Sequence, residues 1–517
     1  MNAGGGPKGD GRGPTLLVAG AFFMENLDGT IISTAAPDIA ASFGVRPVDI
    51  SITMTAYLVA LAVFIPVSGW AADRYGARRV FAWAIAVFTV ASALCAAATG
   101  LPELVVMRVL QGIGGAMMVP VGRLVVLRGT RKTDLLRAIA YLTWPGLLAP
   151  VAAPALGGLF TTYASWRWIF LVNVPLGVVA LLLALRMVPD LREPERPALD
   201  RTGFLLGGAG LAAAVYGLEL FGGPPRSWGT AAAWLAGGLL MCAVTVFHFL
   251  RVRRPLLDPT TMRVHTFRVA NVGGALFRAA ISAVPLLLPL MFQGAFGWSA
   301  ATAGLVLIAV FAGNVAVKPV TTPLLRRFGF RTVLLVNGAA TAVTFLLCAA
   351  LGPRTPMAVV LGVLFVSGVC RSVSLSAYAS LGFADIEPDR TSGANALSST
   401  IQQLAAGLGV AFGALALRAA GPLAPHLGLE GPTAAYRVAF ALLALLPLGC
   451  MVEAARLRRD AGAVVTGRAP PGPTGGTTGR PGGRPREHQA QQRCGIALFG
   501  PVRDDPKELV DAPDSGQ

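Results

Sequence analysis

Charged residues are scarce in this chain. They make up 13% of its 517 residues, while 54% are hydrophobic. A soluble domain carries roughly 25% charged residues, so this scarcity argues against a soluble fold. The 62 Gly and 37 Pro fit membrane helices, where small residues allow close packing and neighbouring groups satisfy a backbone that Pro interrupts. The composition therefore predicts a protein embedded in a lipid bilayer.

Histidine and cysteine are few and scattered. The four His and six Cys lack the spacing of a metal site or a disulfide framework. The chain also lacks the cluster of acids or His that a membrane-embedded enzyme acting on lipid would need. We therefore expect no metal, no cofactor and no enzymatic activity.

The net charge of +17 has two interpretations. It could serve nucleic-acid binding, or it could reflect Arg residues in cytoplasmic loops. The basic residues lie between apolar runs. This placement favours the second interpretation, and we expect no nucleic-acid partner.

Fourteen apolar runs approach the length of about 20 residues that a spanning helix needs. The first contains Glu25 and Asp28 and is followed by many more, so we interpret it as a transmembrane helix and not as a signal peptide. Together the runs predict an all-α polytopic membrane protein. The expected spans are about 15–35, 52–71, 79–98, 103–127, 137–160, 167–188, 203–221, 229–250, 271–294, 301–319, 331–351, 357–381, 394–418 and 434–456.

Basic residues gather in the loops that follow even-numbered runs. Arg74, Arg128, Arg251 and Arg326 lie in four of these loops, and the alternate loops hold few such residues. The positive-inside rule then places the basic loops and both termini in the cytoplasm. We expect a multi-pass protein of the cell membrane.

One loop is repeated. Residues 73–78 read DRYGAR and residues 326–331 read RRFGFR, with Gly at the same place. An offset of eight helices fits two six-helix halves separated by an inserted pair. The final stretch is too polar to form a core, which also argues against a sensor with a folded soluble domain. The expected parts are an N-terminal segment 1–14, a first bundle 15–200, an inserted two-helix linker 201–254, a second bundle 255–458 and a disordered cytoplasmic tail 459–517.

The loop at 69–79, GWAADRYGARR, is the most specific motif. It resembles the signature loop of the major facilitator superfamily, whose fold has two six-helix bundles. The resemblance implies that Gly69 lets two helices approach closely and that Gly76 makes a tight turn. It also implies that Asp73 contacts basic neighbours and a helix N-terminus of the opposite half, and so latches the outward-open state. The basic residues of this latch would be Arg74, Arg78 and Arg79.

Other segments resemble the fourteen-helix drug:proton antiporters of that superfamily. They are residues 26–32 (NLDGTII), Arg108 with residues 111–115 (QGIGG), residues 166–175 (WRWIFLVNVP) and residues 200–203 (DRTG). The resemblance implies a monomeric carrier that works by alternating access. It would move small molecules with a proton gradient as its energy source and would need no cofactor.

The fifth run matches the antiporter motif of that family incompletely. Pro154, Gly157 and Gly158 match, whereas Ala149 and Ala153 stand where Gly is usual. Ala still permits close packing between helices, so we expect the bend in this helix to survive.

Charged residues inside the first half suggest proton coupling. Glu25 and Asp28 are three residues apart and so share a face of one helix. Burial and mutual repulsion favour proton uptake by at least one of them, and Asp28 is preferred because it alone matches the wider motif. Arg108 is the expected relay partner. The alternative is that one acid merely pairs with an Arg for structure.

The second half places Arg278, Lys318 and Arg371 inside apolar runs, with Gln402 further along. Arg278 and Arg371 could bind an anionic group of the substrate, or could pair with the acids of the first helix. Glu219 lies near a helix end in the inserted pair, so we expect it at the surface. The leading hypothesis is proton-driven export of an amphipathic small molecule. The alternative is proton-coupled uptake or symport of an organic anion.

Overall fold

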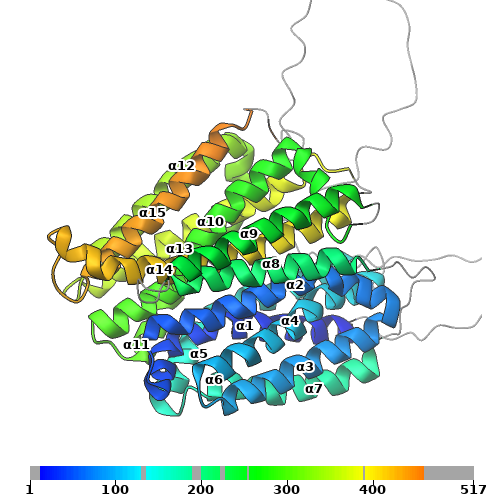
Figure 1. Ribbon diagram of the computed structural model, residues 1–517, viewed down its shortest axis with the longest axis horizontal. Helices are drawn as coiled ribbons and strands as arrows, with labels where there is room; N and C mark the ends of the chain where they lie inside the picture. The colour runs from blue at the N-terminus through cyan, green and yellow to red at the C-terminus, as the bar shows by residue number, and fades with distance from the viewer. Residues whose placement is uncertain are drawn as a thin grey trace, which may run out of the picture. The chain divides into compact units, whose positions relative to one another are not determined.

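The structure is a computed structural model that describes residues 12–129, 135–188, 199–221, 228–252, 255–387, 390–458 and 461. The described chain folds into helices (Figure 1). The predicted tail, apart from Ala461, and the basic residues Arg131 and Lys132 lie outside these ranges. The helices are α1 (Arg12–Phe43), η1 (Pro47–Ile50), α2 (Ser51–Tyr75), α3 (Ala77–Ala97), α4 (Leu101–Gly129), α5 (Leu135–Tyr163), α6 (Trp168–Leu171), α7 (Asn173–Met187), α8 (Arg201–Leu220), α9 (Trp228–Arg251), η3 (Pro259–Arg263), α10 (His265–Leu290), η4 (Met291–Ala295), α11 (Ala300–Ala316), α12 (Lys318–Ala350), α13 (Met357–Gly382), α14 (Thr391–His426) and α15 (Ala434–Ala455).

The predicted all-α membrane fold is confirmed. Twelve of the described helices are long and apolar enough to cross a membrane. Helix α11 is apolar but has only 17 residues. It is continued, after a break at Val317, by the first part of α12, so the predicted span 301–319 corresponds to two helical pieces. With α5, these elements account for the fourteen expected spans.

The repeated loop has the same backbone in both copies. Gly76 ends α2 with φ 93° and ψ 134°, and Gly329 interrupts α12 with φ 77° and ψ 163°. Positive φ strains a residue that carries a Cβ, and Gly avoids that strain. Glycine at this place therefore lets a helix end and the next begin within one residue, in both halves.

Each half has its own apolar core, and a third cluster joins the halves. This joining cluster packs Ile31 of α1 and Ala153 of α5 with Leu286 of α10 and Val410 of α14. Helices α5 and α11 also pack closely, as do α2 and α14. The two halves therefore share buried apolar surface, and polar contacts are not the only interactions that hold them together.

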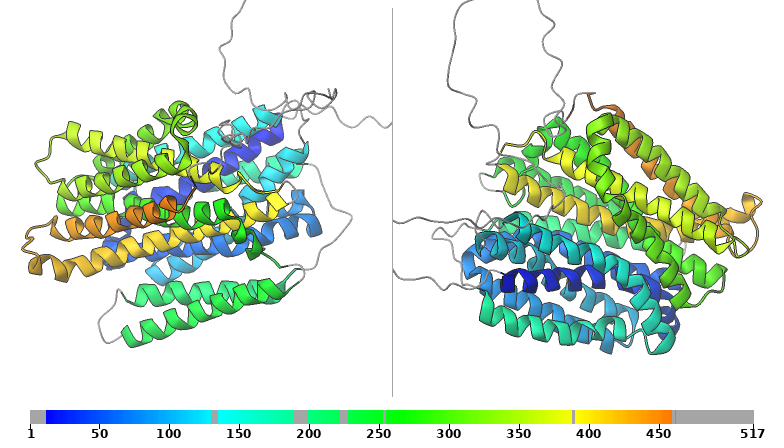
Figure 2. Two further views of the ribbon diagram at one scale, coloured as in Figure 1. Left: turned by 90° about the horizontal axis from the view of Figure 1, so that it is seen from above. Right: turned by 180° about the vertical axis from the view of Figure 1, so that it is seen from behind.

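The inserted pair, α8 and α9, forms a hairpin outside the two bundles (Figure 2). The two helices pack on each other through Gly210 and Gly238, because a Cβ at either position would crowd the opposite backbone. Only 11% of the most apolar stretch of α9 is buried, against 61% for α1. Helix α8, by contrast, touches α2 and α14. The hairpin therefore exposes mainly apolar surface, as a lipid-facing element must.

Two hydrogen bonds between the halves lie at one end of the helices. Gln293 Nε2 donates to the Thr34 carbonyl at 3.0 Å, and the Ala301 N–H donates to Thr162 Oγ1 at 3.1 Å. Both bonds lie near the helix ends opposite the basic loops. The halves are therefore joined at the end that the positive-inside rule predicts to be exterior.

Candidate functional site

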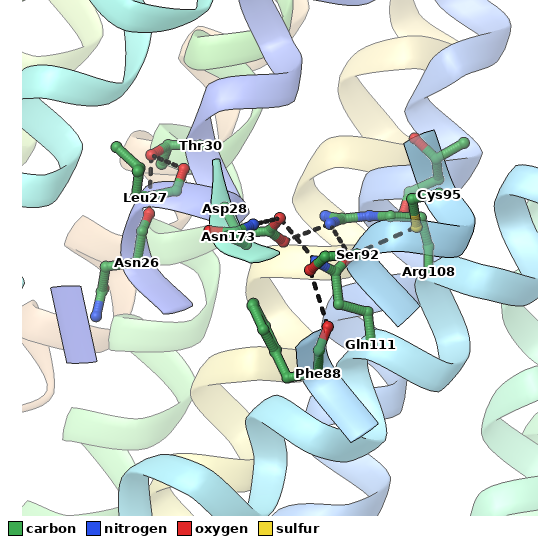
Figure 3. A network of polar contacts seen from close by, with 11 residues as sticks. Asn26, Leu27, Asp28, Thr30, Phe88, Ser92, Cys95, Arg108, Gln111 and Asn173 are labelled. Carbon is green, nitrogen blue, oxygen red and sulfur yellow. Dashed lines mark hydrogen bonds and ion pairs between the residues drawn. The ribbon is translucent and has the colours of Figure 1, made fainter. Parts of the chain in front are cut away.

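Asp28 lies at the centre of a buried polar network in the first half (Figure 3). Its side chain is 0% exposed. Asp28 Oδ1 accepts hydrogen bonds from Gln111 Nε2 at 2.8 Å and from Asn173 Nδ2 at 2.9 Å. Asp28 Oδ2 forms an ion pair with Arg108 Nη1. One carboxylate of α1 therefore holds side chains of both α4 and α7.

Arg108 is also 0% exposed, and an aromatic ring covers its guanidinium. The guanidinium carbon lies 4.2 Å from the centre of the Tyr57 ring, a distance typical of a cation–π contact. Arg108 Nη1 also donates to Gln111 Oε1 at 2.7 Å, whereas Nη2 has no hydrogen-bond partner in the described chain. A buried ion pair offsets the cost of desolvation only with good geometry and further hydrogen bonds, and this pair has several.

Gln111 extends the network to α3. Its Nε2 also donates to Ser92 Oγ at 2.8 Å, and Ser92 Oγ donates to the Phe88 carbonyl at 2.8 Å. Gln111 and Asn173 lie within the motifs at 111–115 and 166–175, which predict no role for either side chain, and Tyr57 and Ser92 were not predicted. A polar side chain within an apolar run was the signal available for all four.

Glu25, the second acid of α1, stands apart from this network. It is half-buried, and its Oε2 accepts a hydrogen bond from Asn26 Nδ2 at 3.1 Å. A Cβ added to Gly115 would lie 3.3 Å from the Tyr57 hydroxyl oxygen and 3.6 Å from Glu25 Cγ, so Glu25 and Tyr57 are neighbours. Glu25 is thus more accessible than the fully buried Asp28, and it lies beside the ring that covers Arg108.

The signature loop connects α2 and α3. Gly76 makes the predicted tight turn, and Asp73 is half-buried at the end of α2. The basic side chains Arg74 and Arg79 are exposed and Arg78 is half-buried. A Cβ added to Gly69 would meet no atom within 4 Å. The close helix approach expected at Gly69 is therefore not formed in this conformation.

Two adjacent glycines of α5 contact helices of different halves. A Cβ at Gly157 would overlap Thr34 of α1, and one at Gly158 would overlap the Ala300 backbone of α11. The Pro154 carbonyl is in turn the nearest neighbour of Gly304 in α11. The antiporter-motif residues therefore lie where α5 packs against both halves.

The basic candidates of the second half fall into two groups: Arg278 and Arg371 form one, and the exposed Lys318 forms the other. Arg278 Nη2 donates to Gln402 Oε1 at 2.8 Å, and Arg371 lies over the Phe311 ring. Lys318 is exposed and donates to Ser376 Oγ at 3.0 Å. Among the described ion pairs, neither Arg278 nor Arg371 pairs with Glu25 or Asp28. The Asp28 carboxylate pairs with Arg108 instead.

The surface position expected for Glu219 is wrong. Its side chain is 8% exposed and forms an ion pair with Arg418 of α14 at 3.2 Å. Arg418 also pairs at 3.0 Å with Asp49 of η1. Burial of Glu219 follows from the packing of α8 on α14, which a sequence cannot show. The triad Asp49–Arg418–Glu219 therefore ties the first half, the second half and the inserted hairpin together.

A metal site is not evident in the described residues, where no three His, Cys, Asp or Glu side chains gather. The site is instead an assembly of carboxylates, guanidinium groups and amides on membrane helices. Such groups are expensive to bury in a membrane and mark ion or substrate pathways.

Comparisons with known proteins agree with this architecture. The chain is 36% identical over 421 residues to “Putative multidrug resistance protein MdtD” of Klebsiella pneumoniae strain 342, covering 80% of this chain and 87% of the relative. It is 37% identical over 404 residues to the protein of the same name from Serratia proteamaculans, covering 77% and 83%.

Solved structures show the same fold at low sequence identity. A peptide transporter of the POT family matches with a TM-score of 0.64 and 15% identity, over 86% of this chain and 97% of that one. A D-xylose-proton symporter matches with a TM-score of 0.59 and 15% identity, over 84% and 97%. The profile described as Major Facilitator Superfamily matches residues 18–257 and 270–503. Matches on both halves, with the paired bundles and the repeated glycine turn, establish that this chain belongs to the major facilitator superfamily of membrane transporters.

Proposed function

We propose that this chain is a proton-driven exporter of small amphipathic molecules, in which Asp28, Arg108 and Glu25 couple proton movement to transport. The relatives carry the name multidrug resistance protein, which favours export over uptake of an organic anion. The observation that carries the coupling is the Asp28–Arg108 ion pair, fully buried inside an apolar bundle.

Stability alone does not account for this pair. Replacing a buried ion pair with apolar residues of similar volume is often neutral or stabilising. Protonation of Asp28, in contrast, would remove its charge and release Arg108. Because Asp28 bonds to side chains of α4 and α7, its protonation would weaken the hold of both helices on α1.

Movement of α1 would reach the second half directly. Helix α1 packs against α5 at Gly157, and its Thr34 carbonyl accepts the hydrogen bond from Gln293. A proton on Asp28 would thus change the relative free energies of two arrangements of the halves, which is what coupling requires. Glu25, which is accessible and beside Tyr57, would take the proton first.

The contacts between the halves support an alternating-access cycle. In this structure the end away from the basic loops is closed by Gln293, Thr162 and the Asp49–Arg418 ion pair. An outward-open state must break these interactions. The signature loop, at the opposite end, would then close and bring Gly69 against the other half.

Transport into liposomes with an imposed pH difference tests the proposal. Asp28→Asn is permanently neutral but keeps an oxygen that can accept from Gln111 and Asn173. We expect it to abolish uphill movement of fluorescent amphipathic dyes while leaving exchange down a gradient. Glu25→Gln should slow the same uphill movement without abolishing it.

Asp38→Asn is the matched control, because Asp38 lies on the same helix but is exposed. It should transport at the wild-type rate. The proposal fails if Asp28→Asn, folded and inserted normally, still moves dye uphill in response to pH as fast as wild type.

A further inference from the structure

Arg278 of α10 and Arg371 of α13 carry positive charge that the described chain does not neutralise. No described carboxylate lies within ion-pair distance of either guanidinium. Gln402 accepts one hydrogen bond from Arg278, and Arg371 Nε is buried without any hydrogen-bond partner. A guanidinium has five N–H donors, so most of this hydrogen-bonding capacity is unused.

The two charges also repel each other, since they are close enough to interact electrostatically. Like charges held together in a low-dielectric region cost free energy unless a counter-charge is present. Arg108 shows how this protein neutralises a buried arginine: it supplies a carboxylate and an amide beside it. Among the described residues no such carboxylate lies beside Arg278 or Arg371, which indicates that an external group supplies their counter-charge.

Space for that counter-charge lies beside Arg278. A cavity of about 60 Å³ is lined by Arg278, Gln402, Ser398, Asn271 and Tyr378. A water molecule needs about 10–15 Å³ by a comparable measure, so the cavity can hold a small anionic group. Gln402 Nε2 donates to Ser398 Oγ at 3.0 Å. This hydrogen bond orients the Gln402 oxygen toward Arg278 and holds the Gln402 side chain in the cavity wall.

Arg371 faces the other half of the protein. It lines a space of about 10 Å³, with Thr30 and Ser33 of α1 on the opposite wall and the Phe311 ring beside it. Thr30 is two residues from Asp28, on the same helix. The positive charge of the second half therefore meets the first half on the helix that carries the proposed proton site.

We propose that Arg278 and Arg371 bind the anionic group of the transported molecule, and that this molecule is an amphipathic carboxylate or sulfonate. Its charged group enters the cavity of about 60 Å³ at Arg278. Arg371 adds positive charge from a separate small space, where Phe311 and Val284 offer apolar surface. The proposal rests on the proposed function only in taking the bound molecule to be the one transported; the charge-selective binding itself needs no proton gradient.

The test is equilibrium binding to the full chain in nanodiscs at one pH, without a gradient. Three probes share the dansyl fluorophore: dansylglycine is an anion, its methyl ester is neutral and dansylcadaverine is a cation. Wild type should bind the anion at least tenfold more tightly than the ester. Arg278→Gln and Arg371→Gln should each raise the dissociation constant for dansylglycine at least tenfold and change that for the ester less than twofold.

Arg268→Gln is the matched control, because Arg268 lies on α10 with Arg278 but is exposed. It should leave all three dissociation constants unchanged. Arg371→Glu should reverse the preference toward dansylcadaverine, a gain that misfolding cannot produce. If the Gln variants fail to fold, Arg371→Lys keeps the charge and should retain the preference for the anion with weaker affinity.

Equal binding of the three probes by wild type, or equal weakening of all three by the Gln variants, would overturn the anion site. These outcomes are independent of proton coupling. Selective binding without pH-driven transport would refute the proposed coupling and leave the anion site standing. Transport driven by pH with no preference for the anion would refute the anion site and leave the proposed coupling standing.

Discussion

The two halves repeat one backbone plan and differ in how they treat buried charge. The turns at Gly76 and Gly329 have matching positive φ. In the first half, however, Arg108 is neutralised by Asp28 and surrounded by amides, whereas Arg278 in the second half has one amide and no described carboxylate. The repeat therefore fixes how the helices connect but not the chemistry between them. In the proposed mechanism, the first half changes its charge by binding a proton and the second by binding an anion.

The largest predicted effect is a difference between the halves in how the loss of one buried charge changes the free energy of unfolding. Asp28→Ala leaves Arg108 buried and unpaired, and breaking a buried pair in this way costs about 3–5 kcal/mol. Arg278→Met removes a charge without a carboxylate partner and should be neutral or stabilising. Thermal melting in detergent measures both, and Asp28→Ala/Arg108→Met should recover most of the loss. Equal destabilisation by Asp28→Ala and Arg278→Met would remove the distinction between the halves.

A second, smaller effect concerns the interaction that joins the halves. Arg418→Ala removes the common cation of Asp49 and Glu219, and hydrogen bonds to charged groups contribute about 1.5–3 kcal/mol. The state closed at the end away from the basic loops should therefore lose roughly tenfold or more in population. Spin-label distances between cysteines introduced at residues 163 and 299 would show the separation.

Arg46→Ala is the control for that experiment. Arg46 also pairs with Asp49, but its side chain is 62% exposed, and an exposed pair contributes about 0–1 kcal/mol. A shift from Arg46→Ala as large as that from Arg418→Ala would show that burial of the triad is unimportant.

Substitution by Ala should have opposite effects on stability at two glycines of the first half. Gly158→Ala places a methyl group against the Ala300 backbone, and such overpacking costs about 1–3 kcal/mol. Gly69→Ala meets open space here and should leave the melting temperature unchanged or raised, while slowing transport if another state needs that space. A normal transport rate for Gly69→Ala would argue that no helix approaches there in the cycle.

The smallest effect lies outside the membrane, at the start of the inserted hairpin. Asp200 caps α8 through the Gly203 N–H at 2.9 Å and contacts His248 of α9 at 2.9 Å. Burial would raise the pKa of Asp200, but these hydrogen bonds hold the pKa below its usual range. An acid with a lowered pKa stabilises the fold above its unfolded pKa of about 3.9, and that contribution disappears as pH falls through the folded pKa.

Asp200→Ala should therefore cost about 1 kcal/mol near neutral pH, the typical value of an N-cap. The variant and wild type should converge in melting temperature below about pH 3.9. Asp200→Asn keeps a capping oxygen and should lose less. A difference between wild type and Asp200→Ala that persists unchanged in acid would show that the charge of Asp200 is not involved.

Much of the fold was predictable because the bilayer imposes simple rules on sequence. The lengths of the apolar runs predicted the spans, and the loops around Gly76 and Gly329 indicated the repeat. Motif residues indicated the family, which the comparisons confirmed. The predicted span 301–319 did not include the break at Val317 or the continuation to Gly329, since neither leaves an apolar signal. The joining of Gly157 and Gly158 to different halves was also not readable, because contact partners depend on packing.

The sequence by itself determined that the chain is a polytopic membrane transporter and which charged residues lie within its helices. Only the tertiary structure decided how those charges are paired. Asp28 and Arg108 are far apart in the chain, as are Glu219 and Arg418, and each pair forms because helix packing brings the two side chains together. The same packing leaves Arg278 and Arg371 without a described carboxylate. Charge along a sequence is a local property, whereas neutralisation in a low-dielectric interior depends on neighbours that only the fold supplies.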